Sequence, residues 1–485
     1  MTVNHHADLL ASFGLSSSIL LVGEHALADI QIVRSIPSRR CVFRAIWQGE
    51  PVFVKMFYGN RANDYALRDM AGIRALQEAN VITPTIRYHG EVKELDAYAV
   101  IYEAIIDADN AEAKWEQLND TDQVRLAIRL VETLAAHHNA KLIQTDMYLK
   151  NFLVTDHVIY TIDGDGIKRF DRLSKHQALH NLSRLLSKFD VLMLNQHLST
   201  LLKAYSDTRL WDASPNTTAT NKQIAHARRK ALAAYAKKVF RQCSDVNVSK
   251  GDQLFTAVRS QYPSQSLPLT VKQLDDYLTT DNLIKDGNTC TVALASVGKR
   301  QLVIKRYNIK SFWHGLSRAF RQTRASISWA NAHRLELLDI QTASPVALIE
   351  ERWFGLKRRA YFLTEYVDAP DASIFFKQIS DKTMRAQAVR ALVQLFYRLY
   401  LLQISHGDMK ASNIKILSDA KPLLIDLDSM KQHISNKCAA KMHAKDIKRF
   451  MQNWKDEPSL YNAFVKVFKV VYADHAPLLA AEIFK

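Results

Sequence analysis

Two long segments of the chain carry apolar residues at every third or fourth position, and this spacing predicts two amphipathic helices. Residues 119–138 place Val124, Ile128 and Val131 on one stripe. Residues 380–403 repeat the pattern, and in both segments an Asn or Asp stands where a helix cap is expected. Two helices of similar design, far apart in the chain, suggest that the halves are built alike.

Short runs of β-branched and other apolar residues follow each predicted helix. They are residues 151–154 and 158–163 after the first helix, and residues 413–417 and 422–426 after the second. Each half also opens with hairpin-like runs around a lysine. The shared plan is a β-rich front, a helix, and a polar loop held between that helix and two short strands, which is an α+β arrangement.

Polar residues inside this plan recur at a nearly constant offset, which marks an internal repeat. The repeated positions, first half before second, are Lys55 and Lys305, Glu103 and Glu365, Asp146 and Asp408, Asn151 and Asn413, and Asp163 and Asp426. Their offsets run from 250 to 263 residues, and the Glu precedes the first Asp by 43 positions in both halves. Chance does not maintain such a register, so we predict two copies of one domain.

The boundary between the copies is predicted from polarity. A length of 485 residues exceeds that of one ordinary domain, and the most polar, proline-containing stretches lie at roughly 206–270. The sequence therefore predicts a first domain over residues 1–240, a linker region over 241–270 and a second domain over 271–485.

Composition limits the class of protein. Hydrophobic residues make up 48% of the chain and charged residues 24%, which are globular proportions, and no apolar run approaches the roughly 20 residues of a membrane span. The first residues lack the pattern of a secretory signal. The four cysteines are scattered without a close pair, which fits thiols that stay reduced. We therefore expect a cytoplasmic protein. The net charge of +16 attracts nucleic acid, anionic lipid and phosphorylated molecules alike.

The repeated polar residues match the needs of phosphoryl transfer from a nucleotide. An Asp orients the attacking hydroxyl and receives its proton, and an Asn five residues later binds Mg²⁺. A second Asp at the end of a nearby strand completes the metal site, and a lysine on a front strand neutralises the phosphates. In this hypothesis Asp146 and Asp408 are catalytic, Asn151, Asp163, Asn413 and Asp426 hold Mg²⁺, and Lys55 and Lys305 bind ATP.

These residues resemble those of the protein-kinase-like superfamily. Within it, "HGDMKASNIKIL" and "LLIDLDSM", with "KRYN" and "SWANAHRL" ahead of them, resemble the bacterial lipopolysaccharide core kinases that phosphorylate heptose or Kdo sugars. The first half, with "QTDMYLKNFLV" and "IYTIDGDGI", is similar to a diverged relative. The resemblance implies two tandem protein-kinase-like domains, each with a β-rich N-lobe and a mainly helical C-lobe. It also implies Mg·ATP as donor and the lipid A–core glycolipid at the inner leaflet as acceptor.

Each half departs from the family pattern at a different place. Neither half has a Gly-rich phosphate loop. The acid expected to pair with the front lysine is Asp69 in the first half, but Ser328 stands at the matching position of the second. In the first half Gln144 replaces the loop histidine, and Tyr148 replaces Lys410, a lysine placed to reach the transferring phosphoryl group. Two active kinases, one active kinase with a degenerate copy, and two non-catalytic domains all stay open, and we favour an active second half.

The functional expectation is ATP-dependent phosphorylation of heptose or Kdo in the lipopolysaccharide inner core, at the cytoplasmic face of the inner membrane. Asp69, Glu103 and Glu365 join the two lysines in the expected ATP sites, and Lys410 joins the catalytic residues. The sequence does not identify the sugar or its hydroxyl.

Other functions compete with this one. A protein Ser/Thr/Tyr kinase is the rival enzyme, although no "APE" element follows either metal aspartate, and a pseudokinase scaffold in envelope assembly would bind without turnover. A nucleic-acid partner rests on charge alone and is not expected. The basic aromatic stretch at 310–324 predicts either an interfacial helix that contacts the anionic surface of the inner membrane or a helix packed on its own lobe.

Overall fold

The structure is a computed structural model that describes residues 20–36, 39–308, 322–353, 356–472 and 474–483. The chain divides into two compact units, Met1–Arg228 and Arg229–Lys485. The division falls within one helix, because α7 (Thr217–Lys238) begins in the first unit and ends in the second. None of the helices within the described residues is long and apolar enough to cross a membrane.

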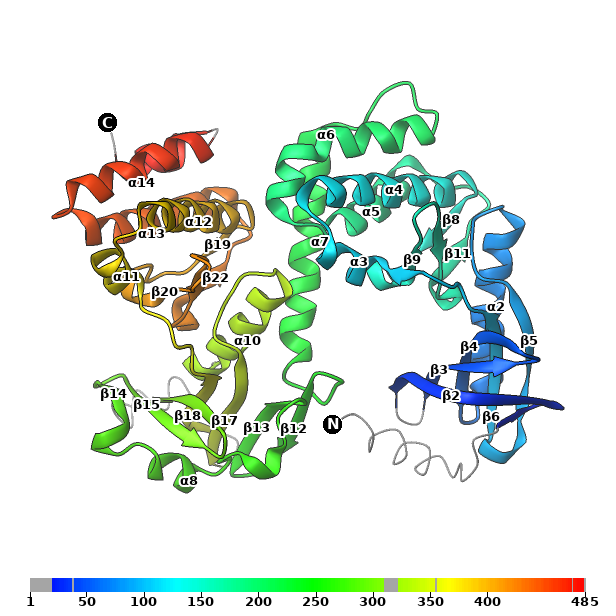
Figure 1. Ribbon diagram of the computed structural model, residues 1–485, viewed down its shortest axis with the longest axis horizontal. Helices are drawn as coiled ribbons and strands as arrows, with labels where there is room; N and C mark the ends of the chain where they lie inside the picture. Colours follow the sequence, from blue (N-terminus) through cyan, green and yellow to red (C-terminus); the bar gives the residue numbers. More distant parts are fainter. Residues whose placement is uncertain (1–19, 37–38, 309–321, 354–355, 473, 484–485) are drawn as a thin grey trace. The chain divides into compact units, whose positions relative to one another are not determined.

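The first unit opens with an antiparallel sheet. Its strands are Leu20–Val22 (β1), His25–Ile36 (β2), Arg40–Trp47 (β3), Glu50–Tyr58 (β4), Ile86–Val92 (β5) and Ala97–Glu103 (β6), in the order β1-β2-β3-β4-β6-β5. Alternate residues of these strands, among them Phe43, Val54 and Ile101, are buried in one cluster. Helix α2 (Ala62–Glu78) runs beside the sheet (Figure 1) and buries Met70 and Ile73 against it.

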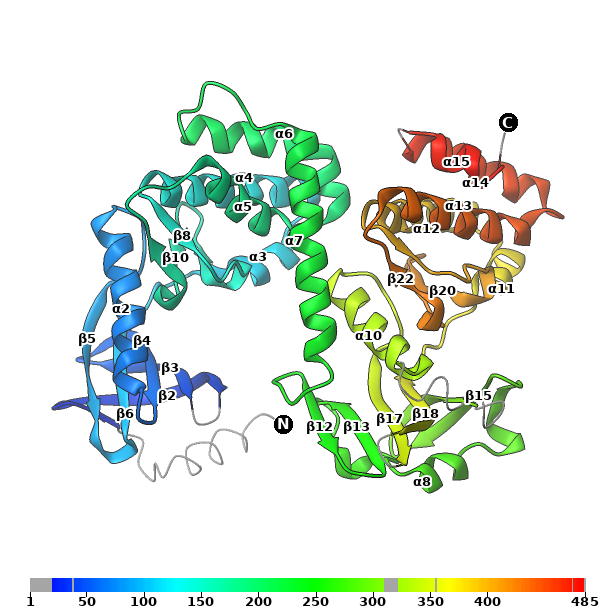
Figure 2. The ribbon, with the colours of Figure 1, turned by 180° about the vertical axis from the view of Figure 1, so that it is seen from behind.

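The remainder of the first unit is mainly helical. Its helices are Ala111–Gln117 (α3), Asp120–Asn139 (α4), Lys175–Leu186 (α5) and Val191–Thr208 (α6). Lys93–Leu95 (η1) connects β5 to β6, and Asp109–Asn110 (β7) precedes α3. Between α4 and α5 lie the short elements Leu142–Gln144 (β8), Leu149–Asn151 (η2), Phe152–Val154 (β9), Ile159–Thr161 (β10), Gly164–Gly166 (η3) and Ile167–Arg169 (β11). The side chain of Asn119 caps α4 by accepting a hydrogen bond from the Asp122 amide, as its position in the sequence predicts. Figure 2 shows α4, α5 and α6 stacked in this part of the unit, where Leu134 and Leu201 are fully buried.

The second unit also begins with an antiparallel sheet. Its strands are Val246–Lys250 (β12), Leu254–Arg259 (β13), Leu283–Asp286 (β14), Cys290–Val297 (β15), Arg300–Tyr307 (β16), Pro345–Trp353 (β17) and Leu356–Glu365 (β18), in the order β12-β13-β17-β18-β16-β15-β14. The connections contain Ser264–Ser266 (η4), Val271–Asp276 (α8) and Thr280–Asn282 (η5). Helix α10 (Arg324–Leu337) packs on the sheet and buries Trp329 and Leu335.

The predicted linker over residues 241–270 differs from the structure. Strands β12 and β13 lie within it and belong to the sheet of the second unit, where Thr256 pairs with Ile349 of β17. Because β12 stands at the sheet edge, most of its residues are exposed, and its sequence therefore has the polarity of a loop. The compact units divide at Arg228 and Arg229, ahead of the boundary that polarity predicts.

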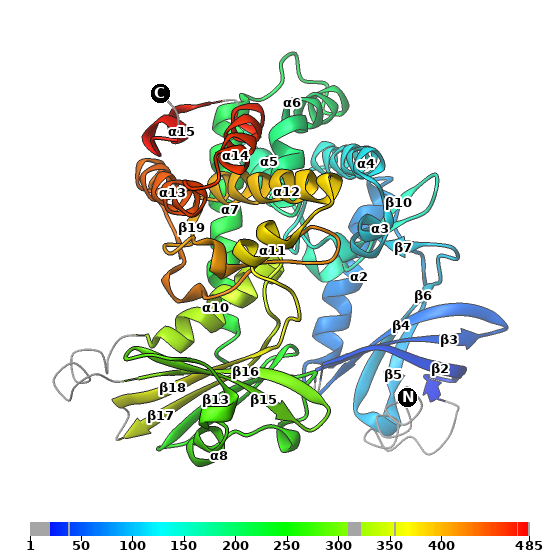
Figure 3. The same cartoon turned by 60° about the vertical axis from the view of Figure 1, so that its left-hand side comes forward.

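Helices make up most of the remaining second unit, as Figure 3 shows. They are Ala372–Gln378 (α11), Lys382–Leu401 (α12), Asn436–Met451 (α13), Pro458–Val471 (α14) and Ala476–Ala480 (α15). The short elements are Ile404–Ser405 (β19), Ala411–Asn413 (η6), Ile414–Ile416 (β20), Pro422–Leu424 (β21), Leu427–Ser429 (η7), Lys431–Gln432 (β22) and Gln452–Trp454 (η8). Phe396 of α12, Phe450 of α13 and Phe468 of α14 meet in a buried aromatic core.

The two units repeat one order of elements. The strand order β3-β4-β6-β5 of the first unit has the same form as β15-β16-β18-β17 of the second, and a helix follows the second strand of each set. A long helix then leads to a short strand, a 3₁₀ turn and a two-stranded ribbon in both units. The internal repeat of the sequence thus has a counterpart in the structure.

Candidate active site

In the second unit the site begins with the lysine of β16. Lys305 lies on a central strand, paired with Val292 on one side and Phe362 on the other. Its Nζ lies 2.5 Å from Asp426 Oδ1 and 3.4 Å from Asp428 Oδ2. Burial acts to lower the pKa of Lys305, but Tyr307 and the two aspartates outweigh it and raise the pKa. The lysine therefore keeps its positive charge inside the site.

Strand β21 delivers Asp426 to this lysine. The backbone of Asp426 has a φ of 62° and η7 follows directly, so the chain turns sharply just where the carboxylate is needed. Burial acts to raise the pKa of Asp426, but the positive charge of Lys305 holds it below its ordinary value. The aspartate is consequently ionised at neutral pH, as a metal ligand must be.

The loop after β19 brings the other polar residues together. Asn413 Nδ2 donates hydrogen bonds to the Asp408 carbonyl oxygen at 2.9 Å and to its carboxylate at 3.2 Å. The same carboxylate lies 3.4 Å from Lys410 Nζ and 3.7 Å from Arg449 Nε. Asp408 thus faces two cations, while its side chain stays partly open to solvent.

Asp446 of α13 holds the start of this loop. Its carboxylate accepts hydrogen bonds from the backbone amides of His406, at 2.7 Å, and Gly407, at 3.0 Å. His406 Nε2 in turn contacts the Ile425 carbonyl oxygen at 3.0 Å, next to Asp426 in the chain. This connection ties the loop to the strand that carries the metal aspartate.

Stability should depend on pH through Asp446. Burial raises its pKa to about 6, and the two amide hydrogen bonds limit the rise, whereas an unfolded Asp has a pKa of about 3.9. The folded protein therefore binds the additional proton between these values, and the stabilisation is complete below about pH 4 and lost as the pH rises through about 6. Over this pH range the free energy of unfolding of the wild-type protein should fall by about 3 kcal/mol. The Asp446→Asn variant should not show this fall.

Urea unfolding of both proteins between pH 4 and 7 measures this difference. The exposed Asp419, which pairs with Lys421 on the surface, supplies the control variant Asp419→Asn, which should follow wild type. Parallel pH profiles for wild type and Asp446→Asn would contradict the role given to the buried carboxyl.

A cavity of about 620 Å³ joins these residues. Its polar lining includes Lys305, Glu365, Lys410, Asn413 and Asp426, and its apolar lining comes from both the sheet and the helical part of the unit. Every one of these five residues is predicted from the sequence to belong to the site. Asp408 lies beside the cavity, in contact with two of its lining residues.

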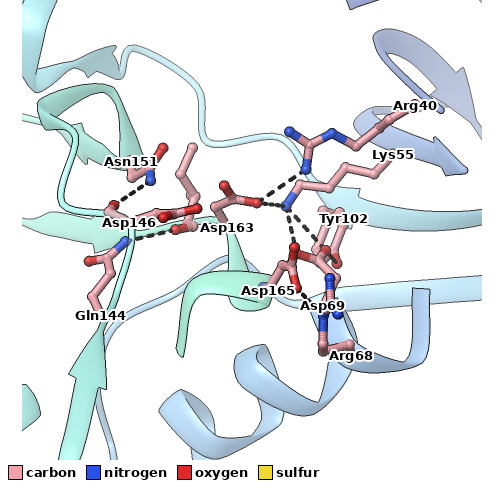
Figure 4. Close-up of polar contacts among 11 residues, drawn as sticks. Arg40, Lys55, Arg68, Asp69, Tyr102, Gln144, Asp146, Asn151, Asp163 and Asp165 are labelled. Carbon is pink, nitrogen blue, oxygen red and sulfur yellow. Dashed lines mark hydrogen bonds and ion pairs between the residues drawn. The ribbon is translucent and has the colours of Figure 1, made fainter. Parts of the chain in front are cut away.

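The first unit pairs its lysine in another way. Lys55 of β4 donates to Asp69 of α2 at 2.9 and 3.1 Å, and its Nζ lies 3.2 Å from Asp163. Tyr102 also donates a hydrogen bond to Asp69. Burial acts to lower the pKa of Lys55, but the charges of Asp69 and Asp163 outweigh it and raise the pKa. Figure 4 shows Lys55 between the two aspartates, the arrangement that the alignment predicts for Asp69.

The loop of the first unit keeps part of the second unit's geometry. Asn151 Nδ2 donates to the Asp146 carbonyl oxygen at 2.8 Å, as Asn413 does to Asp408. Gln144 Nε2 donates to the Ile162 carbonyl oxygen at 3.4 Å, which reproduces the contact of His406. The replacement of the loop histidine therefore preserves its link to the metal strand. Glu103 lies at the end of β6, where its carboxylate accepts from the Thr85 amide at 3.0 Å.

Helix and metal loop meet differently in the two units. In the first, a Cβ on Gly72 of α2 would lie only 1.9 Å from the Gly164 carbonyl oxygen, so the backbones touch. In the second, Asn331 of α10 donates to the carbonyl oxygens of Leu427 and Met430 at 2.9 and 3.0 Å. The first contact is steric, and the second consists of hydrogen bonds.

The second unit is similar to a known family of enzymes. Residues 279–472 match the lipopolysaccharide kinase (Kdo/WaaP) family, a range that contains the whole candidate site of the second unit. The protein is a kinase. The match covers less than half of the chain and leaves the first unit outside it. No curated protein matches the chain.

The residues of the second unit fit the magnesium and ATP that the matched family implies. Mg²⁺ is commonly held by one or two carboxylates together with substrate phosphates, and Asn413 and Asp426 both line the cavity of the second unit. The amide nitrogen of Asn413 donates to Asp408, so its side-chain oxygen is the atom that could bind a metal. Among the described residues there is no cluster of three or more His, Cys, Asp or Glu that could hold a metal ion.

Several residues of the kinase site escaped the sequence analysis. Asp428 and Arg324 are the clearest, because Asp428 pairs with Lys305 and its carboxylate lies 2.7 Å from Arg324. Ser328, the position expected to hold the pairing acid, bonds to the Tyr307 hydroxyl instead. The second aspartate of "LLIDLDSM" is a visible signal for Asp428. Arg449 has no comparable signal.

Proposed function

We propose that the second unit transfers a phosphoryl group from ATP to a heptose or Kdo hydroxyl of the lipopolysaccharide inner core. One observation carries the proposal: the cavity lined by Lys305, Asn413 and Asp426, with Asp408 beside it, lies entirely within the range that matches the lipopolysaccharide kinase family. ATP supplies the phosphoryl group, and the family description supports a core sugar as acceptor.

The side chains are suited to the individual steps of this transfer. The sugar hydroxyl oxygen forms a bond to the terminal phosphorus of ATP, the bond from that phosphorus to the ADP oxygen breaks, and Asp408 takes the hydroxyl proton. Lys305 neutralises phosphate oxygens of the nucleotide. Lys410 lies 3.4 Å from Asp408, so it can stabilise the moving phosphoryl group. Bound Mg²⁺ would neutralise charge between the phosphates, held by Asn413 and Asp426.

We place the reaction at the cytoplasmic face of the inner membrane, with the protein peripheral to it. The net charge of +16 favours an anionic surface and an anionic glycolipid. Most of the basic stretch at 310–324, to which the membrane contact was assigned, lies outside the described residues. Of its cations, Arg324 is described, and its guanidinium faces Asp428 inside the site.

We also propose that the first unit is a second protein-kinase-like domain, so that the protein holds two in tandem. The repeated element order and the contact of Lys55 with Asp163 support this reading. Glu103, Asn151 and Asp163 line its cavity, in the places that Glu365, Asn413 and Asp426 take in the other unit. The metal role of Asn151 and Asp163 and the catalytic role of Asp146 stay predictions.

Loss of the gene should remove a phosphate from the inner core. Mass spectrometry of core oligosaccharide from cells with and without the gene should show one sugar that lacks the mass of a phosphate group, and a plasmid-borne copy should restore it. An inactive copy with Asp408→Asn provides the matched control and should not restore the phosphate. An unchanged core in deleted cells would contradict the proposed acceptor.

The same experiment separates the competing functions. A protein Ser/Thr/Tyr kinase would leave the core unchanged and phosphorylate polypeptides from the same cells when supplied with labelled ATP. A pseudokinase scaffold would alter the amount of core, and the Asp408→Asn copy would then restore the wild-type state as well as the unaltered gene does.

A further inference from the structure

The first unit contains its own cavity, of about 380 Å³, which lies outside the family match. Five cationic side chains line it: Arg34, Arg40, Arg44, Lys55 and Lys150. Its acids are Glu103, Asp109 and Asp163. Among the described residues no carboxylate lies within ion-pair distance of Arg34, so positive charge is left for a ligand.

Arg40 pairs with the aspartate of the first unit that the sequence predicts to hold a metal. Its guanidinium is 3.5 Å from Asp163 Oδ1, the same oxygen that Lys55 approaches to 3.2 Å. Burial acts to raise the pKa of Asp163, but Lys55 and Arg40 hold it below its ordinary value. Figure 4 shows both cations reaching Asp163 from the sheet, on the side away from Asp146 and Asn151.

Within its described residues, the sheet of the second unit has no arginine at the position that matches Arg40. Val42 stands opposite Lys55 in the first sheet, and Val292 stands opposite Lys305 in the second. The residue two positions before each valine is therefore equivalent, and it is Arg40 in one unit and Cys290 in the other. Cys290 is buried and uncharged. The second unit has its own arginine near this position, but Arg324 comes from α10 and pairs with Asp428, whereas Arg40 comes from the sheet and pairs with Asp163 itself.

We propose that the cavity of the first unit binds a nucleoside polyphosphate without a divalent cation, with Arg40 beside Asp163 supplying positive charge that a metal would otherwise supply. A guanidinium offers a planar fork of donors to phosphate oxygens and never loses its charge. Apolar side chains of Val42, Ile73 and Ile162 line the same cavity and suit a nucleoside base. The inference rests on the proposal that the first unit is kinase-like, and it deepens that proposal by replacing the metal role predicted for Asn151 and Asp163 with a role for Arg40.

The loop of this unit favours binding over transfer. The carboxylate of Asp408 faces Lys410 and Arg449, whereas no ion pair holds the Asp146 carboxylate among the described residues. Tyr148 takes the place of Lys410, and its ring lies under Lys150 and Lys188 at 5.1 and 4.9 Å. The cation that would reach a transferring phosphoryl group is replaced by an aromatic ring. A bound nucleotide would therefore be retained rather than consumed.

Calorimetry on the full chain tests this directly. Lys305→Ala removes the lysine of the second unit, so that the remaining ATP binding reports on the first. In this background ATP should bind in EDTA within about threefold of its affinity in Mg²⁺. Arg40→Gln should weaken binding in EDTA by about tenfold or more, which is the contribution of one charged hydrogen bond, and Arg40→Lys should restore part of it. AMP should bind at least tenfold more weakly than ATP, because it lacks the polyphosphate.

Controls make each outcome decisive. Arg125, an exposed arginine of α4 that pairs with Asp122, supplies the matched variant Arg125→Gln, which should bind like the background protein. Lys55→Ala should abolish binding, which assigns the signal to the first unit. ATP binding that is lost in EDTA, or that is unaffected by Arg40→Gln in a protein with an unchanged melting temperature, overturns the inference. Phosphoryl transfer by the wild-type second unit is measured separately, so its failure would count against the proposed function instead.

Discussion

Replacing Asp408 with asparagine is expected to lower the rate of phosphoryl transfer by about 10² to 10⁴, the usual contribution of a general base, and to leave nucleotide affinity nearly unchanged. An amide cannot accept the proton of the sugar hydroxyl. Asp408 lies beside the cavity rather than among the residues that line it, and the residues predicted to bind the nucleotide and its metal, Lys305 and Asp426, are separate from it. Purified protein, labelled ATP and core glycolipid measure the rate, and calorimetry measures the affinity.

The surface variant Asp419→Asn is the control for this experiment. It makes the same chemical change in the same unit, at an aspartate that pairs only with Lys421 on the surface, and should retain wild-type turnover. Unchanged turnover in Asp408→Asn would remove this residue from catalysis. A loss of nucleotide affinity equal to the loss of rate would mean that Asp408 positions the donor.

Asp428→Asn is the second variant for which we expect a large effect, a fall in kcat/KM on the order of 10-fold to 10²-fold. Its carboxylate is buried between Lys305, at 3.4 Å, and Arg324, at 2.7 Å. Loss of the negative charge of Asp428 would leave two cations close together inside the site, and Lys305 would pair with Asp426 alone. The lysine would then be held less firmly where the phosphates arrive, so the KM for ATP should rise more than kcat falls.

A compensating change should restore part of the loss. Ser328 of the second unit occupies the position of Asp69, whose carboxylate lies 2.9 Å from Lys55. The double variant Ser328→Asp with Asp428→Asn should therefore recover ATP affinity by supplying the acid from the helix. Ser328→Asp alone controls for the added charge, and melting temperatures check that each variant folds. Wild-type kinetics in Asp428→Asn alone would show that Lys305 does not need Asp428.

The parts of the site that depend on short stretches of chain could be predicted from sequence. The hydrogen bond from Asn413 to Asp408 needs only a turn of five residues, and the same turn recurs at Asn151. Lys55 and Lys305 were identified because each lies on an apolar strand at the same place in the repeat. Repetition makes these residues visible, because two copies keep their spacing while unrelated positions drift.

The second acid beside Lys305, Asp428, could not be predicted in the same way. Ser328 shows that α10 does not supply an acid to Lys305. The acid is instead Asp428, from the loop after β21, and its position depends on how α10 packs against that loop. The position of a buried carboxylate relative to a helix is a tertiary property, and alignment of the two halves does not contain it. The edge strand β12 is a similar case, because its polar residues resemble a linker until its partner β13 is known.

The contact between Gly72 and Gly164 has a mechanical consequence. Two backbones that touch without side chains between them offer nothing that can rotate aside, so α2 and its metal loop should shift as one body. In the second unit a buried side chain stands between α10 and its loop, because Asn331 donates both hydrogen bonds, and a side chain can change its torsion angles when the two backbones shift. We therefore expect the helix and its loop to move together in the first unit and to adjust separately in the second. A ligand or partner that shifts the loop should change the geometry of the second unit more easily than that of the first.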